Sequence, residues 1–284
     1  MTVTVPNNGP GEYLLVRDAA EKERLEMQFR LWQSHLGYLL HPTIEQHEHM
    51  RIADVGTGTG AWLRELAAVV PETCQLDGFD ISDDLFYKSL TQRTNLSFHL
   101  QNVLQPFPEE FVGKYDVVNV RLLAVALSSN EWPTAVRNVV ALLRPGGHLQ
   151  WSDCAPQGCV VKAPPGVTPT RAIRMMEVFY KTLDSLGKTP EIHNLLGIFQ
   201  KSELVSCKME TIELDKPEMR DELNLTITNV MAHGLTASFR LHKLEDIQSE
   251  QQIADLRDGV LEDLRTIGCY FSYSFYLVIG QKPL

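Results

Sequence analysis

The feature that most constrains this 284-residue chain is a glycine-rich turn directly after a short apolar run. Residues Asp54 to Gly60 read Asp-Val-Gly-Thr-Gly-Thr-Gly and follow Ile52-Ala53. Three alternating glycines allow a tight bend between a strand and a helix, and they remove the Cβ atoms that would keep a ligand from the backbone. The pattern therefore predicts a nucleotide-type binding turn.

The acid at Asp54 distinguishes between two classes of ligand. A carboxylate beside the turn would repel the pyrophosphate of a dinucleotide, whereas it would attract the ammonium and sulfonium groups of S-adenosylmethionine (SAM). The glycines alone leave both classes open, because Gly56, Gly58 and Ala61 also satisfy the dinucleotide fingerprint G-x-G-x-x-A. The charge of Asp54 favours SAM, with an NAD-type ligand as the alternative.

A second acid, Asp80, ends the run Leu76 to Asp80 and lies 20 residues after Gly60. Proteins of both cofactor classes use an acid here to accept hydrogen bonds from ribose hydroxyls. Asp80 therefore predicts adenosine binding without deciding the cofactor. The structural alternative is a helix N-terminus, because Ser82 to Asp84 could begin the next helix.

Two later stretches complete an ordered series of motifs. Lys114 to Arg121 reads Lys-Tyr-Asp-Val-Val-Asn-Val-Arg, an apolar strand, and Leu142 to Trp151 holds a Pro-Gly-Gly stop between a helix and a new strand. With the glycine turn and Asp80, the series resembles the motifs of class I SAM-dependent methyltransferases, and it is most similar to their fungal secondary-metabolism branch. The resemblance extends over about residues 13 to 153.

The resemblance implies a set of SAM contacts: Tyr13, Asp54, Gly56, Gly58, Gly60, Asp80, Ile81, Asn102, Val103 and Arg121. In this set Asp80 would hold the ribose and Ile81 would pack on the adenine. Asn102 stands where the family usually has an Asp that binds the adenine amino group, and an amide oxygen can still accept from that group. Arg121 ends the fourth strand, next to the methionine part of SAM, and a surface salt bridge is the alternative for its side chain.

An N-terminal arm extends the resemblance. In relatives this arm carries a Tyr and an Arg-Leu-x-x-Gln pattern and covers the cofactor, and Tyr13, Arg24 and Gln28 match it. The apolar stripe of the predicted helix is Leu25, Phe29, Trp32 and Leu36. The alternative is a packing helix with a solvated polar face.

Strand and helix patterns alternate from Met50 to Asp153, with a helix predicted in each of the four connections. They predict an α/β, Rossmann-like fold with a seven-stranded, mostly parallel sheet whose last strand is antiparallel. We divide the chain into a disordered tail (1–12), an N-terminal helical arm (13–49) and a SAM-binding α/β domain (50–284). Helical insertions at about 155–190 and 216–267 are predicted to form a lid over the carboxyl ends of the strands, with plain core packing as the alternative.

Composition argues against several classes of partner. The net charge is −10 and Lys and Arg are dispersed, so nucleic acid is not expected, because phosphate binding needs a basic face. No apolar run approaches the ~20 residues that span a bilayer, and Met1 to Gly11 has no apolar signal core. The odd number of cysteines, 5, then favours reduced thiols and a cytoplasmic protein. Oligomeric state stays open.

Methyl transfer from a sulfonium depends on alignment and exclusion of water more than on proton chemistry, so a missing catalytic signature says little against it. Asp153, where the fifth strand should end, and His233 are candidates for a general base. Their alternatives are turn capping and an ordinary packed or exposed histidine. His47-Glu48-His49 has the wrong spacing for a shared helical face, so no metal site is predicted.

The predicted function is a SAM-dependent methyltransferase that modifies an O, N or S atom of a small hydrophobic natural product and releases S-adenosylhomocysteine (SAH). A second hypothesis keeps the fold and the cofactor but not the methylation, as a SAM-binding cyclase or isomerase. A third hypothesis is an NAD(P) oxidoreductase, and a fourth is a non-catalytic regulator.

Overall fold

The computed structural model describes residues 17, 19–86, 94–188, 192–244 and 246–284. The predicted disordered tail at residues 1–12 and the predicted cofactor contact Tyr13 lie outside these residues.

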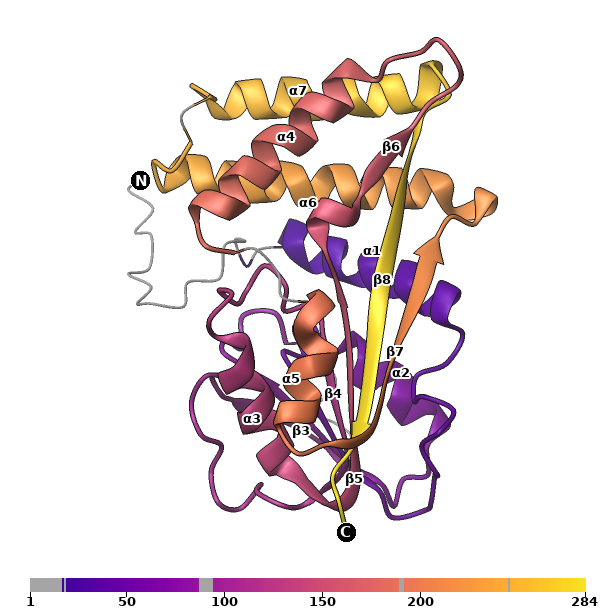
Figure 1. The fold of residues 1–284 in the computed structure, drawn as a ribbon, viewed down its shortest axis with the longest axis vertical. Helices are drawn as coiled ribbons and strands as arrows, with labels where there is room; N and C mark the ends of the chain where they lie inside the picture. Colours follow the sequence, from indigo (N-terminus) through magenta and orange to yellow (C-terminus); the bar gives the residue numbers. More distant parts are fainter. Residues whose placement is uncertain (1–16, 18, 87–93, 189–191, 245) are drawn as a thin grey trace.

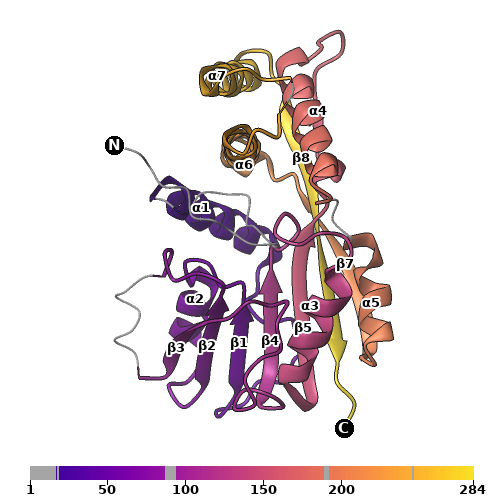
Figure 2. The ribbon, with the colours of Figure 1, turned by 90° about the vertical axis from the view of Figure 1, so that its left-hand side faces the viewer.

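The sheet of the described chain has eight strands in the order β3-β2-β1-β4-β5-β8-β6, and β7 pairs with β8 (Figures 1 and 2). The strands are β1 (Arg51–Val55), β2 (Gln75–Asp80), β3 (Leu96–Leu100), β4 (Tyr115–Arg121), β5 (Leu143–Cys154), β6 (Val160–Lys162), β7 (Val205–Leu214) and β8 (Tyr270–Gln281). Pairs among β1 to β5 are parallel, whereas β8 is antiparallel to β5, β6 and β7. This arrangement confirms the predicted Rossmann-like fold, and the short β6 adds an eighth strand to the seven expected.

Seven α-helices lie in the described residues: α1 (Ala19–Leu36), α2 (Ala61–Val69), α3 (Trp132–Leu142), α4 (Thr170–Ser185), α5 (Leu195–Lys201), α6 (Arg220–Arg240) and α7 (Glu250–Thr266). Figure 1 shows α2 on one face of the sheet and α3 and α5 on the other. Two apolar clusters correspond to these layers. The first packs α2 residues such as Leu63 against Ile52 and Val117, and the second packs Val136 of α3 and Phe199 of α5 against Val118.

One predicted helix is wrong. Residues 101–114, between β3 and β4, contain turns and no helix. Pro106 and Pro108 explain this, because an interior proline removes a backbone donor and clashes with the preceding turn. The helix expected between β2 and β3 falls partly on residues 87–93, which are outside the described chain.

The predicted insertions contain α4, α6 and α7, which stack beyond the carboxyl ends of the central strands (Figures 1 and 2). We call these three helices the cap. They share an apolar cluster with α1 and the first half of β8, including Phe179, Met231, Leu235 and Phe271. The helix α1 lies between the cap and the sheet (Figure 2).

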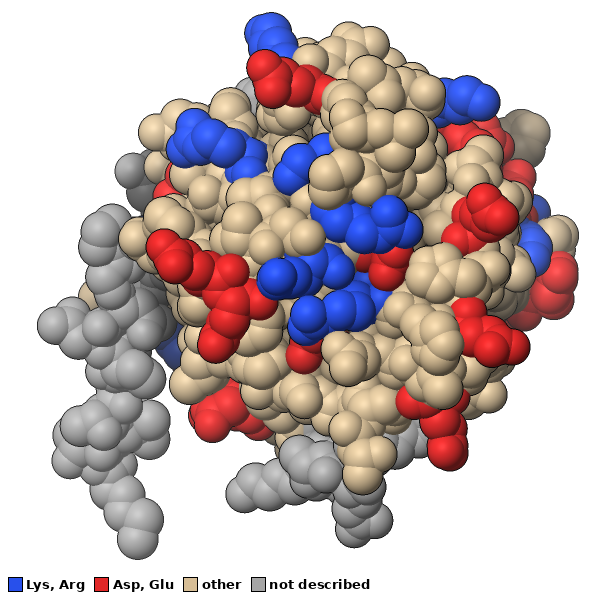
Figure 3. All heavy atoms as spheres, turned by 90° about the horizontal axis from the view of Figure 1, so that it is seen from below, with Lys and Arg blue, Asp and Glu red and all other residues tan. Residues whose placement is uncertain are grey.

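The end of the molecule opposite the cap carries charges of both signs. Figure 3 shows Lys and Arg side chains near the centre of this face, with acidic side chains around them. Within the described ranges, no helix has both the length and the apolar character needed to cross a bilayer.

Candidate active site

The glycine turn after β1 has the backbone conformation that its sequence predicts. Gly56, Gly58 and Gly60 have φ angles of 71°, 56° and 76°, in the left-handed region that glycine adopts without steric cost. The amides of Gly56 and Thr57 both donate to the carbonyl oxygen of Phe79, over 2.8 and 3.0 Å. These bonds attach the turn to the end of β2 and leave its inner side open to a cavity.

Asp54 is buried at the base of this turn, with 3% of its surface exposed. Its Oδ2 accepts from the Thr57 hydroxyl and its Oδ1 accepts from the Asn119 side chain, each over 2.6 Å. Burial raises the pKa of Asp54, while the Thr57 hydrogen bond and the nearby charge of Arg121 act against this rise. The cavity is therefore bordered by a carboxylate that a cationic ligand would stabilise in its ionised form.

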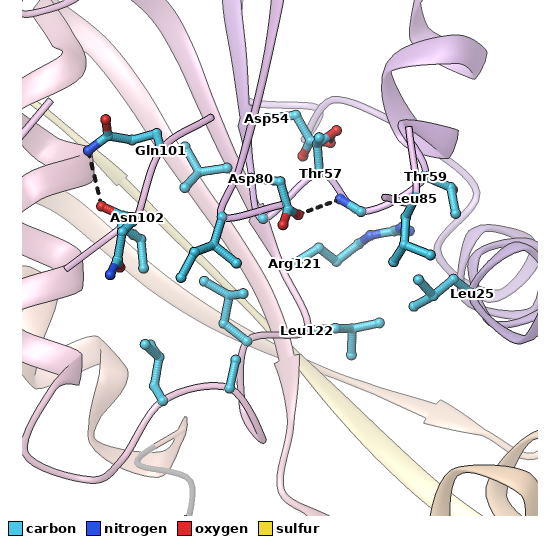
Figure 4. Close-up of a pocket in the computed structure, with 18 of the residues that line it drawn as sticks. Leu25, Asp54, Thr57, Thr59, Asp80, Leu85, Gln101, Asn102, Arg121 and Leu122 are labelled. Atoms are coloured by element: carbon cyan, nitrogen blue, oxygen red, sulfur yellow. Dashed lines mark hydrogen bonds between the residues drawn. The ribbon is translucent and has the colours of Figure 1, made fainter. Parts of the chain in front are cut away.

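Asp80 lies on the other side of the turn. Its Oδ2 accepts from the Gly58 amide over 2.8 Å, as Figure 4 shows, and its Oδ1 accepts from the Ser82 amide over 3.3 Å. Burial raises its pKa against these hydrogen bonds. The next residue, Ile81, is 50% exposed where it borders the same cavity. An exposed apolar side chain beside a partly buried acid suits a nucleoside, with its ribose on the acid and its base on the isoleucine.

The first cavity is enclosed by the carboxyl ends of β1, β2 and β4 and by α1. Its open volume is about 1120 Å³, including solvent space at its mouth. Asn102 and Val103 form part of its wall, and Asn102 Oδ1 accepts from the Leu104 amide over 2.9 Å. This hydrogen bond fixes the orientation of the Asn102 side chain and leaves its NH₂ group without a partner among the described residues.

Arg121 lies in the same cavity, between Asp80 and Leu25 in Figure 4. Its guanidinium stacks 4.6 Å from the ring centre of Phe29 and forms no hydrogen bond or ion pair with a described residue. Burial lowers its pKa to about 10, and the charges of Asp54 and Glu26 act against that shift. The buried guanidinium of Arg121 and the buried carboxylate of Asp54 therefore line the same cavity, and together they are the complement of an amino-acid group.

The helix α1 is attached to the glycine turn by Glu26. This carboxylate accepts from the Thr59 hydroxyl and from Arg64, each over 2.7 Å. One turn earlier, Arg24 forms two 2.7 Å hydrogen bonds with Glu21 and donates to Gln28 Oε1 over 3.1 Å. The helix α1 of the predicted arm therefore borders the cavity with Leu25 and Gln28 and is attached to the turn by partly buried polar contacts.

A second cavity adjoins the first beneath the cap. Leu25, Gln28 and Leu122 line both, and the rest of the second cavity comes from α1, the ends of β4 and β5, α4 and α6. Its open volume is about 760 Å³, and apolar side chains such as Phe179 and Met231 dominate its wall. Apolar cavities with a few polar groups are typical small-molecule sites.

Asp153 borders the second cavity but is fully buried. Its two oxygens accept hydrogen bonds from the amides of Leu123, Ala124 and Cys154 and from the Trp151 indole, over 2.8 to 3.2 Å. Burial raises its pKa to about 6. These four donors give Asp153 an anchoring role for the loop after β4, which was the alternative to a general base.

His233 lines neither of the two cavities. Its Nδ1 lies 3.3 Å from Glu21 Oε2, and its side chain borders a third hollow between α1, α6 and α7. The structure therefore does not bring His233 and Asp153 together in one site. In the described chain, no three His, Cys, Asp or Glu side chains are grouped to hold a metal ion.

Sequence reasoning missed the residues that support Asp54. Asn119 Oδ1 accepts from Gln150 Nε2 over 2.8 Å, and Gln150 Oε1 accepts from the His41 amide over 3.0 Å. The available signal was a polar residue inside each of two apolar strands, in Val-Val-Asn-Val and Leu-Gln-Trp. A buried amide in a strand needs partners, so it marks a polar network.

Comparison with known proteins identifies the family. Residues 52–147 match the family described as methyltransferase domain. The whole chain is similar to methyltransferase grgD of a Penicillium species, with 31% identity over 95% of this chain and 96% of that protein. The chain is a class I SAM-dependent methyltransferase. The family decides between the SAM and NAD interpretations of the glycine pattern and confirms SAM as the cofactor.

Other similar proteins belong to the same fungal branch. N-methyltransferase tcpN of Claviceps purpurea is 27% identical over 94% of this methyltransferase and 95% of its own length. N-methyltransferase sirN of Leptosphaeria maculans is 36% identical over 53% of this chain and 52% of its own. Among solved structures, Haemonchus contortus phosphoethanolamine N-methyltransferase 2 in complex with SAM shares the fold, with a TM-score of 0.52 and 14% identity over 89% of this chain and 53% of that one.

Proposed function

We propose that this methyltransferase transfers the methyl group of SAM to a nitrogen atom of a small, largely apolar natural product. The observation that carries the proposal is the junction of the two cavities at Leu25, Gln28 and Leu122. A donor held in the first cavity and an acceptor held in the second would meet at this junction beneath the cap. Alignment and water exclusion are what this displacement chiefly needs.

The residues of the first cavity fit SAM as follows. Asp54 would hold the ammonium, Asp80 the ribose hydroxyls, and Ile81 with Asn102 and Val103 the adenine. Arg121 would hold the methionine carboxylate, because its guanidinium has no ion-pair partner among the described residues and carboxylates are its preferred partners. When bound, SAM supplies an electrophilic methyl group on a positively charged sulfur. Tyr13 stays a predicted contact.

Two observations support nitrogen as the acceptor atom. The similar proteins tcpN and sirN are named N-methyltransferases. Among the described residues that line the second cavity, the one carboxylate is Asp153, which already accepts four hydrogen bonds. A poorly acidic hydroxyl would need a general base, whereas a neutral amine attacks with its own lone pair.

A matched acceptor panel tests the proposal. We would incubate the enzyme and SAM carrying a ¹³C-methyl group with 3-benzylaniline, 3-benzylphenol and 3-benzylthiophenol, and would follow products by mass spectrometry and NMR. We expect labelled methyl on nitrogen, with one SAH formed per product. Labelling of the phenol or thiol alone would replace nitrogen by oxygen or sulfur. Conversion of an acceptor without SAH formation would favour the cyclase or isomerase hypothesis.

A further inference from the structure

Gln28 occupies the boundary between the cofactor and acceptor cavities. It projects from α1, is 8% exposed and lines both cavities. A polar side chain at this boundary can contact an acceptor close to its reacting atom.

The orientation of the Gln28 amide is set by its neighbours on α1. Arg24 Nη1 donates to Gln28 Oε1 over 3.1 Å, so the oxygen of the amide is directed toward the arginine. Arg24 is held in turn by two hydrogen bonds from its guanidinium to Glu21, which is fully buried. The NH₂ group of Gln28, with two donors, is therefore the end that remains for a ligand.

Two further residues that line the second cavity carry a donor group without a protein partner. The Trp32 indole nitrogen and the Thr226 hydroxyl form no hydrogen bond with a described residue, although their side chains are only 3% and 1% exposed. An indole N–H can only donate. Buried donors without a partner are costly, and a ligand that accepts hydrogen bonds would remove that cost.

The charge of the cavity wall disfavours a cationic acceptor. Arg24 reaches the wall but is ion-paired with Glu21, and Asp153 has both oxygens occupied by donors, so the described wall offers a cationic acceptor no unpaired carboxylate. Burial in such a cavity lowers the pKa of an amine, which keeps its lone pair free for attack. The wall thus suits a neutral nitrogen compound that presents an oxygen acceptor.

We infer that the acceptor is a neutral amine-type compound with a carbonyl oxygen near its reacting nitrogen, and that Gln28 determines specificity by donating to this oxygen. The inference rests on the proposed N-methylation. In the reaction the nitrogen lone pair forms the N–CH₃ bond, the C–S bond breaks with its electron pair left on sulfur, and the N–H proton passes to water.

The test compares 3-aminobenzophenone with 3-benzylaniline, which differ by a carbonyl in place of a methylene. Affinities for the enzyme saturated with SAH would be measured by calorimetry. We expect wild type to bind the ketone about fivefold more tightly, the value of one neutral hydrogen bond. Gln28→Met should bring the two affinities within about twofold. Gln33→Met, on the same helix but outside the second cavity, should keep the preference. SAH binding by each variant shows that the cofactor cavity is intact.

Three results would overturn the inference: equal affinity of wild type for the two compounds, a preference that survives in Gln28→Met, or no binding of either compound to the SAH-loaded enzyme. None of these three results shows which atom is methylated, because the ¹³C-methyl assay determines that atom independently. Labelling of nitrogen in either compound would leave the proposed function standing while the specificity role of Gln28 fails.

Discussion

Asn119 donates its side-chain amide to Asp54 Oδ1 over 2.6 Å, and it can do so in one orientation only. Its oxygen accepts from Gln150, and Gln150 is fixed by the His41 amide and the Leu39 carbonyl oxygen. The row of amides from the arm to the glycine turn therefore holds the carboxylate that faces the ammonium in the proposed complex. Supporting groups of this kind position a binding residue without touching the ligand.

Replacing Asn119 tests this support. We expect Asn119→Leu to weaken SAH binding about tenfold and to lower the free energy of unfolding by about 1–3 kcal/mol, because Asp54 and Gln150 each lose a buried partner. Calorimetry with SAH and urea denaturation measure the two effects. Asn95→Leu is the matched control, since Asn95 donates only to the Cys74 carbonyl oxygen at the other end of the sheet. Unchanged SAH affinity in Asn119→Leu would contradict the role of the amide row.

The raised pKa of Asp54 predicts a pH dependence of binding. Burial raises this pKa in the free enzyme, and an ammonium beside the carboxylate should lower it again. SAH binding should therefore release protons and weaken as the pH falls, by up to about tenfold per pH unit below the pKa of the free enzyme. Calorimetry in buffers of different ionisation enthalpy detects the protons. The ligand 5′-methylthioadenosine lacks the amino-acid group and should show a smaller dependence; an equal dependence for both ligands would count against Asp54.

Arg121→Met tests the carboxylate contact. We expect SAH affinity to fall about tenfold or more, because a charge-assisted hydrogen bond contributes about 1.5–3 kcal/mol. The affinity for 5′-methylthioadenosine should change little, since it has no carboxylate. Arg64→Met provides a comparison, because Arg64 binds Glu26 at the edge of the turn and should affect both ligands alike. Parallel losses for both ligands in Arg121→Met would mean that Arg121 acts on the fold and not on the carboxylate.

Asp153→Asn separates anchoring from base catalysis. The folded-state pKa of Asp153 is raised from 3.8 to about 6, so its protonated form stabilises the fold at low pH and this contribution is lost as the pH rises between these two values. The loss is at most about 3 kcal/mol. An asparagine does not titrate and satisfies fewer of the four donors, so the variant should be most destabilised relative to wild type near pH 5 and less so at pH 8.

Urea denaturation near pH 5 and at pH 8 measures the free energy of unfolding of wild type and Asp153→Asn. Asp258→Asn, on an acid whose side chain is 69% exposed, should show no such trend. A variant with wild-type stability at both pH values but methylation reduced a hundredfold would instead identify Asp153 as a base.

Much of the fold and the conformation of the glycine turn could be predicted, because the relevant signals are local. The left-handed conformations of Gly56 and Gly60 follow from the residue type, and Asp80 follows from its place at the end of a strand. The helix predicted at 101–114 was wrong, because it was inferred only from the alternation of strands and helices along the chain. Pro106 and Pro108 in this segment disfavour a helix.

The acceptor side could not be predicted, because it depends on contacts across distant segments. Nothing in the sequence around His233 indicates that it lines neither of the two cavities, or that Asp153 meets the amides of Leu123 and Ala124. The Glu21-Arg24-Gln28 set was accessible in part, because residues three and four apart share a helix face. The sequence does not show that Arg24 and Gln28 of this set face a cavity, because the opposite wall of that cavity comes from the distant helices α4 and α6.

The strand β8 passes from the cap straight through the sheet, where it pairs with β5 and β7 over most of its 12 residues. Because the cap is continuous with a paired strand, a hinge motion that moves the cap together with β8 would break this pairing. The helix α1, which borders both cavities, is held to the glycine turn by the contact of Glu26 with Thr59 and Arg64. We expect Glu26→Gln, which weakens this contact, to hasten the dissociation of SAH and to weaken cofactor retention, as stopped-flow measurement of SAH release would show.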